Sequence, residues 1–263
     1  MIALHRLSLV FGEAGPDRVQ ALRNIDLTLA KGDFLTIIGS NGAGKSSLFN
    51  ALSGLHLPSS GRIEKDGMDI TRHPEHRRAA FIGRVFQDPL MGTAGNMSVQ
   101  DNLTIASYKG MKHLRISLNR RRKAEFRRLL ARLDMGLEDR MEENVGRLSG
   151  GQRQALTMLM MVLSAPDLVL LDEHTAALDP KNAAKVLELT DTFYRDYNLT
   201  VMMITHDMRM ALAHGSRLIM MDRGEVILEA AGREKSELTV EELVRRFHDI
   251  RGENLSNDEA LLS

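Results

Sequence analysis

The sequence contains no cysteine. Disulfide bonds, thiolate metal sites, iron–sulfur ligation by this chain and cysteine nucleophiles are therefore excluded, and the composition fits a reducing compartment. Net charge is absent as well, because 35 Lys and Arg residues stand against 35 Asp and Glu residues. We therefore expect no overall electrostatic attraction to DNA or RNA and no nucleic-acid partner.

Long apolar runs are also missing. The longest uninterrupted stretches, such as residues 158–163 and 168–171, fall far short of the roughly 20 residues that cross a bilayer. Residues 1–6 lack the basic start, apolar core and small-residue cleavage site of a secretory signal. With 263 residues, of which 43% are hydrophobic, the chain is long enough to bury a sizeable core. We expect a globular protein that does not span a membrane and is not secreted.

The first part of the chain has the pattern of strands around one glycine loop. Alternating apolar and polar residues predict half-buried strands at 2–11 and 25–29, joined through the turn cluster 12–17. An apolar run at 34–38 predicts a strand, and helical spacing follows the glycine loop at 45–55. A hairpin that turns at Asp66-Gly67 is predicted for 61–71, and a further strand for 80–86.

From about residue 88 to residue 163 the pattern is helical, with amphipathic stretches at 99–108, 118–133 and 152–163 and no convincing strand. Strands and helices then alternate, as in parallel α/β folds, with strands at 168–171, 200–204 and 217–221 and helices at 180–197 and 207–213. After Gly232 we predict one amphipathic helix at 239–250 with Leu243, Phe247 and Ile250 on its apolar side, followed by a polar end.

A phosphate-binding pattern lies between the strand at 34–38 and the helix at 45–55. Residues 39–46 match G-x-x-x-x-G-K-[ST], in which a glycine-rich turn and a helix start direct backbone N–H groups at phosphate oxygens. The lysine adds a cation, and the hydroxyl that follows it can bind magnesium. The alternative is a glycine-rich turn with a chance Lys-Ser. The expected nucleotide contacts are Gly39, Ser40, Asn41, Gly42, Ala43, Gly44, Lys45, Ser46 and Ser47.

Two carboxylates follow the apolar strand at 168–171. They predict Asp172 beside the metal ion and Glu173 near the water that attacks the γ-phosphate. An isolated Asp-Glu pair at a strand end is commonly only a helix cap, but the phosphate-binding pattern upstream favours the catalytic interpretation. The substrate is then a nucleoside triphosphate.

A second candidate anion site is the helix start at Leu148-Ser149-Gly150-Gly151-Gln152. From these residues alone it could be only an N-cap. The pentapeptide nevertheless matches, letter for letter, the signature sequence of the nucleotide-binding subunits of ATP-binding cassette transporters. Over about residues 1–230 the chain resembles that family, and its further motifs occur in family order.

The resemblance implies an α/β fold: a P-loop NTPase core with an N-terminal antiparallel β subdomain and an inserted helical subdomain. It implies an ATPase domain at 1–231 with the insertion at about 88–165, and a C-terminal helix and tail at 232–263. It assigns Gln87 to magnesium and the attacking water, and His206 to the γ-phosphate. Asp179 lies in the loop that contacts the dimer partner, and Phe11 is the aromatic that stacks on adenine, although a lone phenylalanine at a strand end is more often a core residue.

The resemblance further implies partners. ATP and Mg²⁺ would lie in a head-to-tail dimer, in which Ser149, Gly150, Gly151 and Gln152 of one copy close over nucleotide held by Lys45 of the other. The dimer would be attached to the cytoplasmic face of the inner or plasma membrane through a separate permease, docked by Gln87 and residues 90–108. Stand-alone subunits of this length are typical of bacterial importers with capture proteins, and residues 173–180 are similar to a branch linked to amino-acid uptake.

Two positions differ from the family pattern, and two other functions remain open. His174 stands where proline is common, and Ala176 where a serine is common. We hypothesise that His174 modulates Glu173 and gives the ATPase activity an added acid-side pH dependence. The alternative is that His174 is a tolerated loop residue. The main alternative function is a soluble cassette ATPase similar to iron–sulfur assembly ATPases. A P-loop kinase or GTPase would leave residues 149–152 and His206 unexplained.

Overall fold

The computed structural model describes residues 1–12, 18–107 and 119–251. The chain divides into two compact units, one made of Met1–Ala79 and the chain from Thr200 onward, the other of Ala80–Leu199. No helix in the described ranges is long and apolar enough to cross a membrane. The elements combine an antiparallel sheet with a sheet built on parallel strands, as the predicted α/β class requires.

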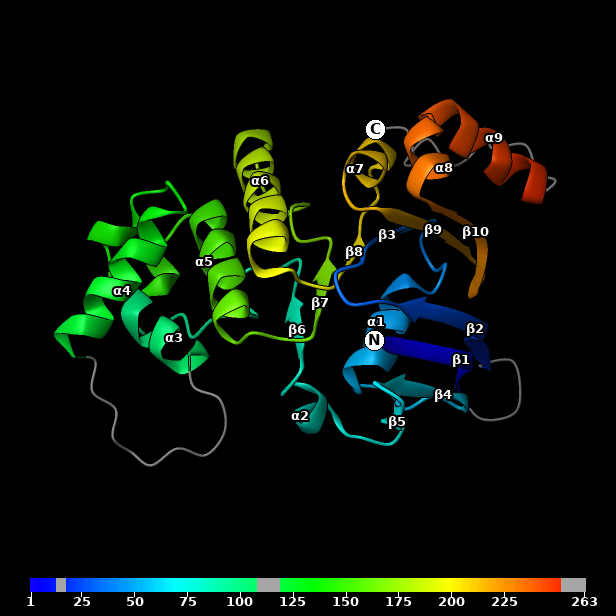
Figure 1. Ribbon diagram of the computed structural model, residues 1–263, viewed down its shortest axis with the longest axis horizontal. Coiled ribbons are helices and arrows are strands. Elements are labelled where there is room, and N and C mark those ends of the chain that lie inside the picture. Colours follow the sequence, from blue (N-terminus) through cyan, green and yellow to red (C-terminus); the bar gives the residue numbers. More distant parts are fainter. Residues whose placement is uncertain (13–17, 108–118, 252–263) are drawn as a thin grey trace. The chain divides into compact units, whose positions relative to one another are not determined.

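The antiparallel sheet of the first unit has the strand order β2-β1-β4-β5 (Figure 1). The strands are β1 (Ile2–Phe11), β2 (Val19–Leu29), β4 (Ser60–Lys65) and β5 (Met68–Asp69). The predicted strand at 25–29 was too short, because β2 already pairs with the end of β1 at Phe11↔Val19. Residues 13–17 of the predicted turn lie outside the described residues.

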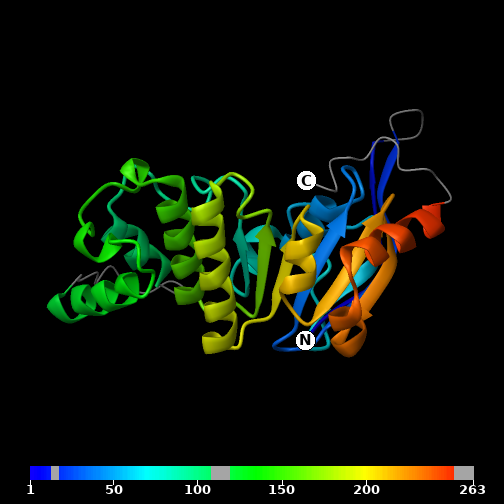
Figure 2. The same cartoon turned by 90° about the horizontal axis from the view of Figure 1, so that it is seen from above.

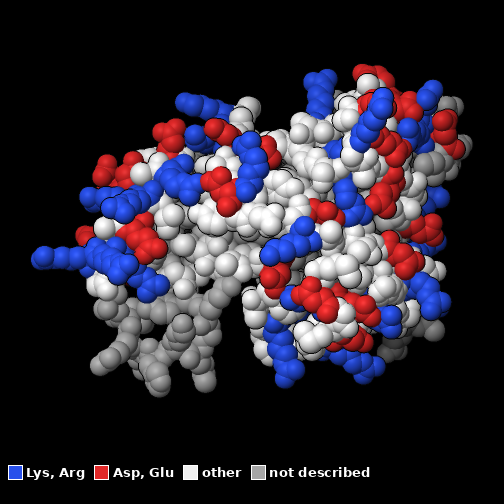
Figure 3. All heavy atoms as spheres, in the orientation of Figure 1, with Lys and Arg blue, Asp and Glu red and all other residues white. Residues whose placement is uncertain are grey.

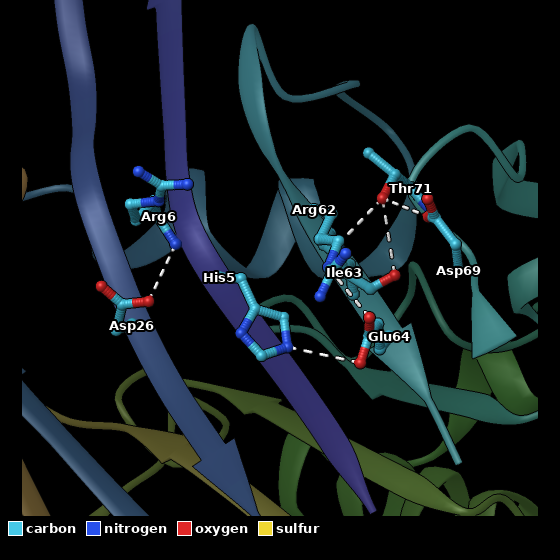
Figure 4. Close-up of polar contacts among 8 residues, drawn as sticks. All are labelled: His5, Arg6, Asp26, Arg62, Ile63, Glu64, Asp69 and Thr71. Atoms are coloured by element: carbon cyan, nitrogen blue, oxygen red, sulfur yellow. Dashed lines mark hydrogen bonds and ion pairs between the residues drawn. The ribbon is translucent and has the colours of Figure 1, made fainter. Parts of the chain in front are cut away.

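Polar side chains link neighbouring strands of this sheet (Figure 4). Glu64 on β4 lies 3.3 Å from His5 Nε2 on β1 and 2.9 Å from Arg62 Nε. Thr71 Oγ1 accepts a hydrogen bond of 2.9 Å from the N–H of Ile63, which fixes the return of the β4–β5 hairpin. These contacts explain why a strongly polar stretch still pairs as strands.

The second sheet of this unit has β3 (Phe34–Gly39) between two parallel neighbours, β9 (Arg217–Asp222) and β8 (Val201–Ile204). All six residues of β3 are buried, as expected for a central parallel strand. An unpredicted strand, β10 (Glu225–Ala231), pairs antiparallel with β9. The connecting residues Arg223 and Gly224 both have positive φ, the conformation of a type I′ hairpin, but Arg-Gly is a weak sequence signal for that turn.

Helices complete the first unit. After β3 comes α1 (Lys45–Ser53), which ends two residues before the predicted 55 because Gly54 adopts a left-handed conformation. A short α2 (Glu75–Arg78) was not predicted. The apolar sides of α7 (Met208–Ala213) and α9 (Val240–Arg251) pack with β9 and β10 in one core cluster, so Leu243 and Phe247 are buried as predicted (Figures 1 and 2). The side chain of Ile250 lies outside the described residues.

The C-terminal segment contains a further helix that the sequence did not reveal. The polar α8 (Gly232–Glu237) is anchored by Lys235, which is 3% exposed although charged. Its Nζ donates to the carbonyls of His214 and Gly215 and lies 3.4 Å from Thr36 Oγ1. A buried cation, not an apolar stripe, therefore fixes α8 to the parallel sheet.

The second unit has two parallel strands, β6 (Ile82–Val85) and β7 (Leu168–Asp172). Its helices are α3 (Val99–Ala106), α4 (Arg120–Ala131), α5 (Gly150–Leu163) and α6 (Pro180–Tyr197), with 3₁₀ turns at Leu137–Asp139 and Val145–Arg147. Between α3 and α5 the described residues form no strand beyond the isolated bridge Ser98↔Asn144. The helical prediction is thus confirmed there, while Tyr108 and Leu118 lie outside the described residues.

Candidate nucleotide-binding site

The predicted phosphate loop connects β3 to α1 in the first unit. Gly39 has φ +151°, and a Cβ there would lie 2.2 Å from the carbonyl oxygen of Met221, so only glycine fits. Ala43 N–H donates to the Ser40 carbonyl, closing a turn inside the loop. Lys45 is 5% exposed, and its Nζ donates to the carbonyls of Gly39 (2.6 Å) and Ser40 (3.0 Å). The ammonium group is therefore held over the loop by the loop's own backbone.

The N-terminus of α1 has no side-chain cap within the described structure. Its N-cap residue is Gly44, with φ +100°, and a Cβ there would lie 2.5 Å from the carbonyl oxygen of Ala21. The first N–H groups of any α-helix lack partners inside the helix. At α1 they stay available to an anion, beside the exposed Ser46 and the half-buried Ser47.

His206 follows the carboxyl end of β8, next to the strand that leads into the loop. Thr205 N–H donates to the Ile37 carbonyl over 3.1 Å, and Ile37 is also in register with Ile204. His206 is half-buried, and Asp207 after it caps α7 by accepting from the N–H groups of Arg209 and Met210. The fold thus brings the predicted histidine to the same sheet edge as the phosphate loop, where open α/β sheets bind ligands.

Phe11 ends β1 with 37% of its surface exposed. Its ring meets the imidazole of His56 edge to face, with 5.0 Å between the ring centroids. The alternative that Phe11 is a core residue is therefore wrong, whereas its stacking on adenine stays a prediction. His56 is a neighbour that sequence spacing did not indicate.

The second unit carries the acidic pair. Asp172 ends β7, and Glu173 follows in a left-handed conformation with φ +47°. Since Val85 and Leu171 are in register on parallel strands, Gln87 and Glu173 follow the carboxyl ends of β6 and β7 at one edge. Gln87 is exposed there.

Asp172 also has a partner that the sequence did not predict. Arg84 on β6 donates from its terminal guanidinium nitrogen to Asp172 Oδ2 over 2.6 Å, and both side chains are largely buried. The guanidinium carbon lies 4.8 Å from the centre of the Phe86 ring. Arg84 thus orients the carboxylate that the sequence assigned to a metal ion.

The signature pentapeptide forms the start of α5. Ser149 is the N-cap, and its Oγ accepts from Gln152 N–H while Gln152 Oε1 accepts from Ser149 N–H, a complete capping box. Arg140 donates to Gln152 Oε1 over 2.9 Å, and Gln152 donates to the Met135 carbonyl. Gly150 and Gly151 follow the cap, so their N–H groups remain at the open end of the helix.

Asp179 caps the neighbouring helix α6 and lies close to the signature. It accepts from Asn182 N–H over 3.1 Å and from Asn182 Nδ2 over 2.6 Å, and these bonds lower the pKa of Asp179. A Cβ on Gly151 would lie 2.5 Å from Asn182 Cγ, so the two helix starts touch. Ser149, Gln152 and Asn182 also line a cavity of about 620 Å³. Asn182 is a contributor that pattern reasoning missed.

The two departures from the family pattern have different surroundings. His174 is 2% exposed, and its Nε2 lies 3.1 Å from Thr190 Oγ1 on α6. Ala176 is exposed, and its N–H donates to the Glu173 carbonyl. His174 therefore packs inside the unit and holds α6 to the loop after β7, which favours a structural role for the residue.

The predicted residues thus fall into two groups. The loop 39–47, Phe11 and His206 belong to the first unit. Gln87, Asp172, Glu173, residues 149–152 and Asp179 belong to the second. Among the described residues, no cluster of three or more His, Asp or Glu side chains is arranged to hold a metal ion.

Comparison with known proteins identifies the family. The family model described as "ABC transporter" matches residues 22–176. A tyrosine transport ATP-binding protein of Clostridioides difficile is 43% identical over 94% of this chain and 98% of its own length. A methionine import ATP-binding protein of Chromohalobacter salexigens is 35% identical over 88% of this chain, which spans 64% of that protein.

Solved structures agree with this assignment. The ATP-binding cassette MJ0796, a dimer in a post-hydrolysis state with ADP and Pi, superimposes with a TM-score of 0.73 at 27% identity, covering 89% of this chain and 99% of that one. The phosphate loop, the acidic strand end and the signature helix start are all present in the fold described above. The chain belongs to the ABC transporter family, of which it is an ATP-binding and ATP-hydrolysing subunit.

Proposed function

We propose that ATP binds to the loop 39–47 with its phosphates on the open N-terminus of α1. The observation that carries this proposal is the helix start at Gly44, whose N–H groups receive no side-chain cap from the described residues. Lys45 exchanges its carbonyl partners for β- and γ-phosphate oxygens, and His206 contacts the γ-phosphate. Phe11, half-exposed at the end of β1, stacks on adenine.

In this proposal Glu173 accepts a proton from the water that attacks the γ-phosphate, giving ADP and phosphate. The hydroxyl of Ser46, the amide oxygen of Gln87 and the carboxylate of Asp172 are hard oxygen donors that suit Mg²⁺. When bound, Mg²⁺ neutralises charge on the phosphates. Arg84 orients the Asp172 carboxylate through its 2.6 Å bond.

We further propose that two copies bind ATP head to tail, so that residues 149–152 and Asp179 of one copy face the nucleotide on the other. The dimeric cassette MJ0796 supports this arrangement. The contact between Gly151 and Asn182 supports a shared surface for the signature and the Asp179 loop. Closure on ATP and release after hydrolysis then produce the opening and closing motion that drives a partner.

The partner in this proposal is a separate integral-membrane permease of an importer, which holds the subunit at the cytoplasmic face of the membrane and works with a substrate-binding protein. Gln87 and residues 90–108 dock it, with exposed apolar side chains at Leu90, Met91 and Ile105. The similarity to the tyrosine transport protein over nearly the whole chain supports an aromatic amino acid as cargo.

Glu173→Gln tests the chemistry. We expect hydrolysis, measured as phosphate release, to fall by about 10²–10⁴ while binding of a fluorescent ATP analogue is retained. Glu75→Gln, on the exposed start of α2, is the matched control and is expected to change neither quantity. Unchanged phosphate release from Glu173→Gln would contradict its role as the base.

Affinity purification tests the transport role. A tagged Glu173→Gln chain is recovered with ATP from gently solubilised membranes, and the proteins that accompany it are identified. A multispanning protein supports the importer, and loss of labelled tyrosine uptake in cells lacking the chain supports the cargo. Recovery of soluble proteins alone would overturn the transport role in favour of a soluble assembly ATPase.

A further inference from the structure

Helix α4 carries a stripe of arginines on its outer side. With 3.6 residues per turn, positions 120, 121, 124, 127, 128 and 131 fall within an arc of about 120°. All six residues are exposed, and they are four arginines and two alanines. The opposite side is the core side, where Phe126 is 2% exposed and Leu130 is fully buried. We call Arg120, Arg121, Arg127 and Arg128 the α4 stripe.

The α4 stripe has no partner among the described residues, unlike the other cations of this helix and unlike its C-cap residue, Arg132. Lys123 lies 3.3 Å from Glu142, Arg122 donates to Ser107 Oγ over 2.6 Å, and Arg132 pairs with Asp196. The one acid on α4 is Glu125, at the edge of the arc. Asp139 and Glu142 line a cavity of about 570 Å³ with Arg120 and Arg127, but in the described structure neither acid forms an ion pair with them.

The charge pattern of α4 opposes the local stability of the helix. Four consecutive cations, residues 120–123, occupy the first turn, and that turn contains no acid. Cations at a helix N-terminus oppose the helix dipole, and helices instead favour acids there. Two of these cations, Arg120 and Arg121, belong to the α4 stripe and have no partner among the described residues. Cations that weaken the helix without stabilising another part of the protein indicate a demand from outside it. Because the chain as a whole has no net charge, this demand is confined to one surface.

We propose that the α4 stripe contacts the anionic phospholipid headgroups of the membrane, an inference that rests on the proposed attachment of the subunit to a permease. Clusters of four to eight basic residues on a helix bind anionic lipid surfaces, and guanidinium groups form paired hydrogen bonds with phosphate. The two alanines have short side chains, so nothing between the arginines obstructs their contact with a flat surface. Blue side chains gather over α4 in Figure 3, with red ones beside them, as expected for contact at one helix face.

The same chemistry argues for lipid rather than nucleic acid. Single-stranded nucleic-acid sites combine a basic groove with exposed aromatic rings on which bases stack. The aromatic ring on α4 belongs to Phe126, which is buried beneath the helix with Arg122 at 5.7 Å from its centre. A flat cationic stripe without an exposed ring fits a surface of phosphates.

Sedimentation of the purified full-length chain with vesicles tests the proposal. One vesicle preparation is phosphatidylcholine alone, and the other is equal parts phosphatidylcholine and phosphatidylglycerol. The test variant replaces all four arginines of the α4 stripe with glutamine. The control variant removes the same charge elsewhere through Arg23→Gln, Lys31→Gln, Arg72→Gln and Arg77→Gln, all exposed and distant in sequence from α4.

We expect the wild type and the control to bind the anionic vesicles only, with binding that weakens as salt is added, and the test variant to bind at least tenfold more weakly. Binding of a fluorescent ATP analogue, measured in parallel, is expected to be equal in all three proteins, so failure of the nucleotide site is recognised separately. Equal vesicle binding by the two variants would overturn the proposal. So would wild-type binding to a single-stranded RNA or an acidic peptide, through the stripe, without binding to vesicles.

Discussion

Replacing Arg78 with methionine is expected to destabilise the helix that follows the phosphate loop. Arg78 is fully buried, and its guanidinium donates to four carbonyls. Two belong to the last turn of α1, Ala51 at 2.7 Å and Leu52 at 2.8 Å, and the others to Thr71 and His73. Burial lowers the pKa of Arg78, although a guanidinium stays protonated in proteins. Arg78 therefore acts as a buried cationic cap on the C-terminus of α1.

The magnitude follows from two opposing contributions. Each hydrogen bond from a charged donor contributes about 1.5–3 kcal/mol, so the loss of four such bonds costs on the order of 6–12 kcal/mol. Methionine has a similar length and leaves little cavity, and the variant no longer buries a charge, which returns several kcal/mol of that cost. We expect a net decrease in the free energy of unfolding of about 2–4 kcal/mol.

Urea denaturation followed by circular dichroism measures the change, with Arg77→Met as the control because Arg77 is exposed on the same short helix. The control is expected to stay within about 0.5 kcal/mol of the wild type. Arg78→Lys is expected to lie between the two, because one ammonium group cannot reach four carbonyls that a planar fork satisfies. A loss below about 1 kcal/mol for Arg78→Met would show that water replaces the guanidinium and would refute the reasoning.

Three further predictions concern Lys235, the phosphate loop and His174. Burial lowers the pKa of Lys235 from 10.5 to about 8. Between pH 8 and pH 10.5 the unfolded chain therefore binds more protons than the folded chain, so the free energy of unfolding is expected to rise by about 2 kcal/mol over this range. The rise should vanish in Lys235→Met. Gly39→Ala is expected to abolish nucleotide binding and to lower the free energy of unfolding, measured by urea denaturation, by several kcal/mol, because its Cβ would meet a backbone oxygen at 2.2 Å. Gly42→Ala has open space around its Cβ and should cost about 1–2 kcal/mol for its positive φ alone. His174→Pro is expected to lower the melting temperature while its pH–rate profile between about pH 6 and 8 superimposes on that of the wild type; a changed profile would restore the hypothesis that His174 modulates Glu173.

Elements with strong periodicity were predictable from sequence, and elements held by single polar contacts were not. The buried strand at 34–39 was found because its residues form a continuous apolar run, and the helix at 180–197 because apolar residues recur at every turn. The α8 segment has no apolar stripe, since Lys235 anchors it through backbone carbonyls. β10 was missed because its turn, Arg223-Gly224, reaches positive φ without an asparagine or aspartate.

The candidate site shows the same division. Its motif residues lie within short continuous segments, so spacing alone identified them. Their supports come from distant parts of the chain: Arg84 reaches Asp172 from a different strand, and Arg140 reaches Gln152 across 12 positions. A local sequence pattern cannot predict such a hydrogen bond, because the arginine that donates to a carboxylate or an amide can lie on any neighbouring element. Only the fold reveals which one it is.

The open start of α1 follows from the backbone at Gly44. The N-caps of the helices α5, α6 and α7 are Ser149, Asp179 and Asp207, and the side chain of each accepts a hydrogen bond from an N–H group of the first turn. Gly44 cannot be exchanged for such a residue, since its φ is +100° and any Cβ attached to it would lie 2.5 Å from the Ala21 carbonyl oxygen. The chain therefore caps three of these four helices itself, whereas the positive end of α1 is available to an anionic ligand.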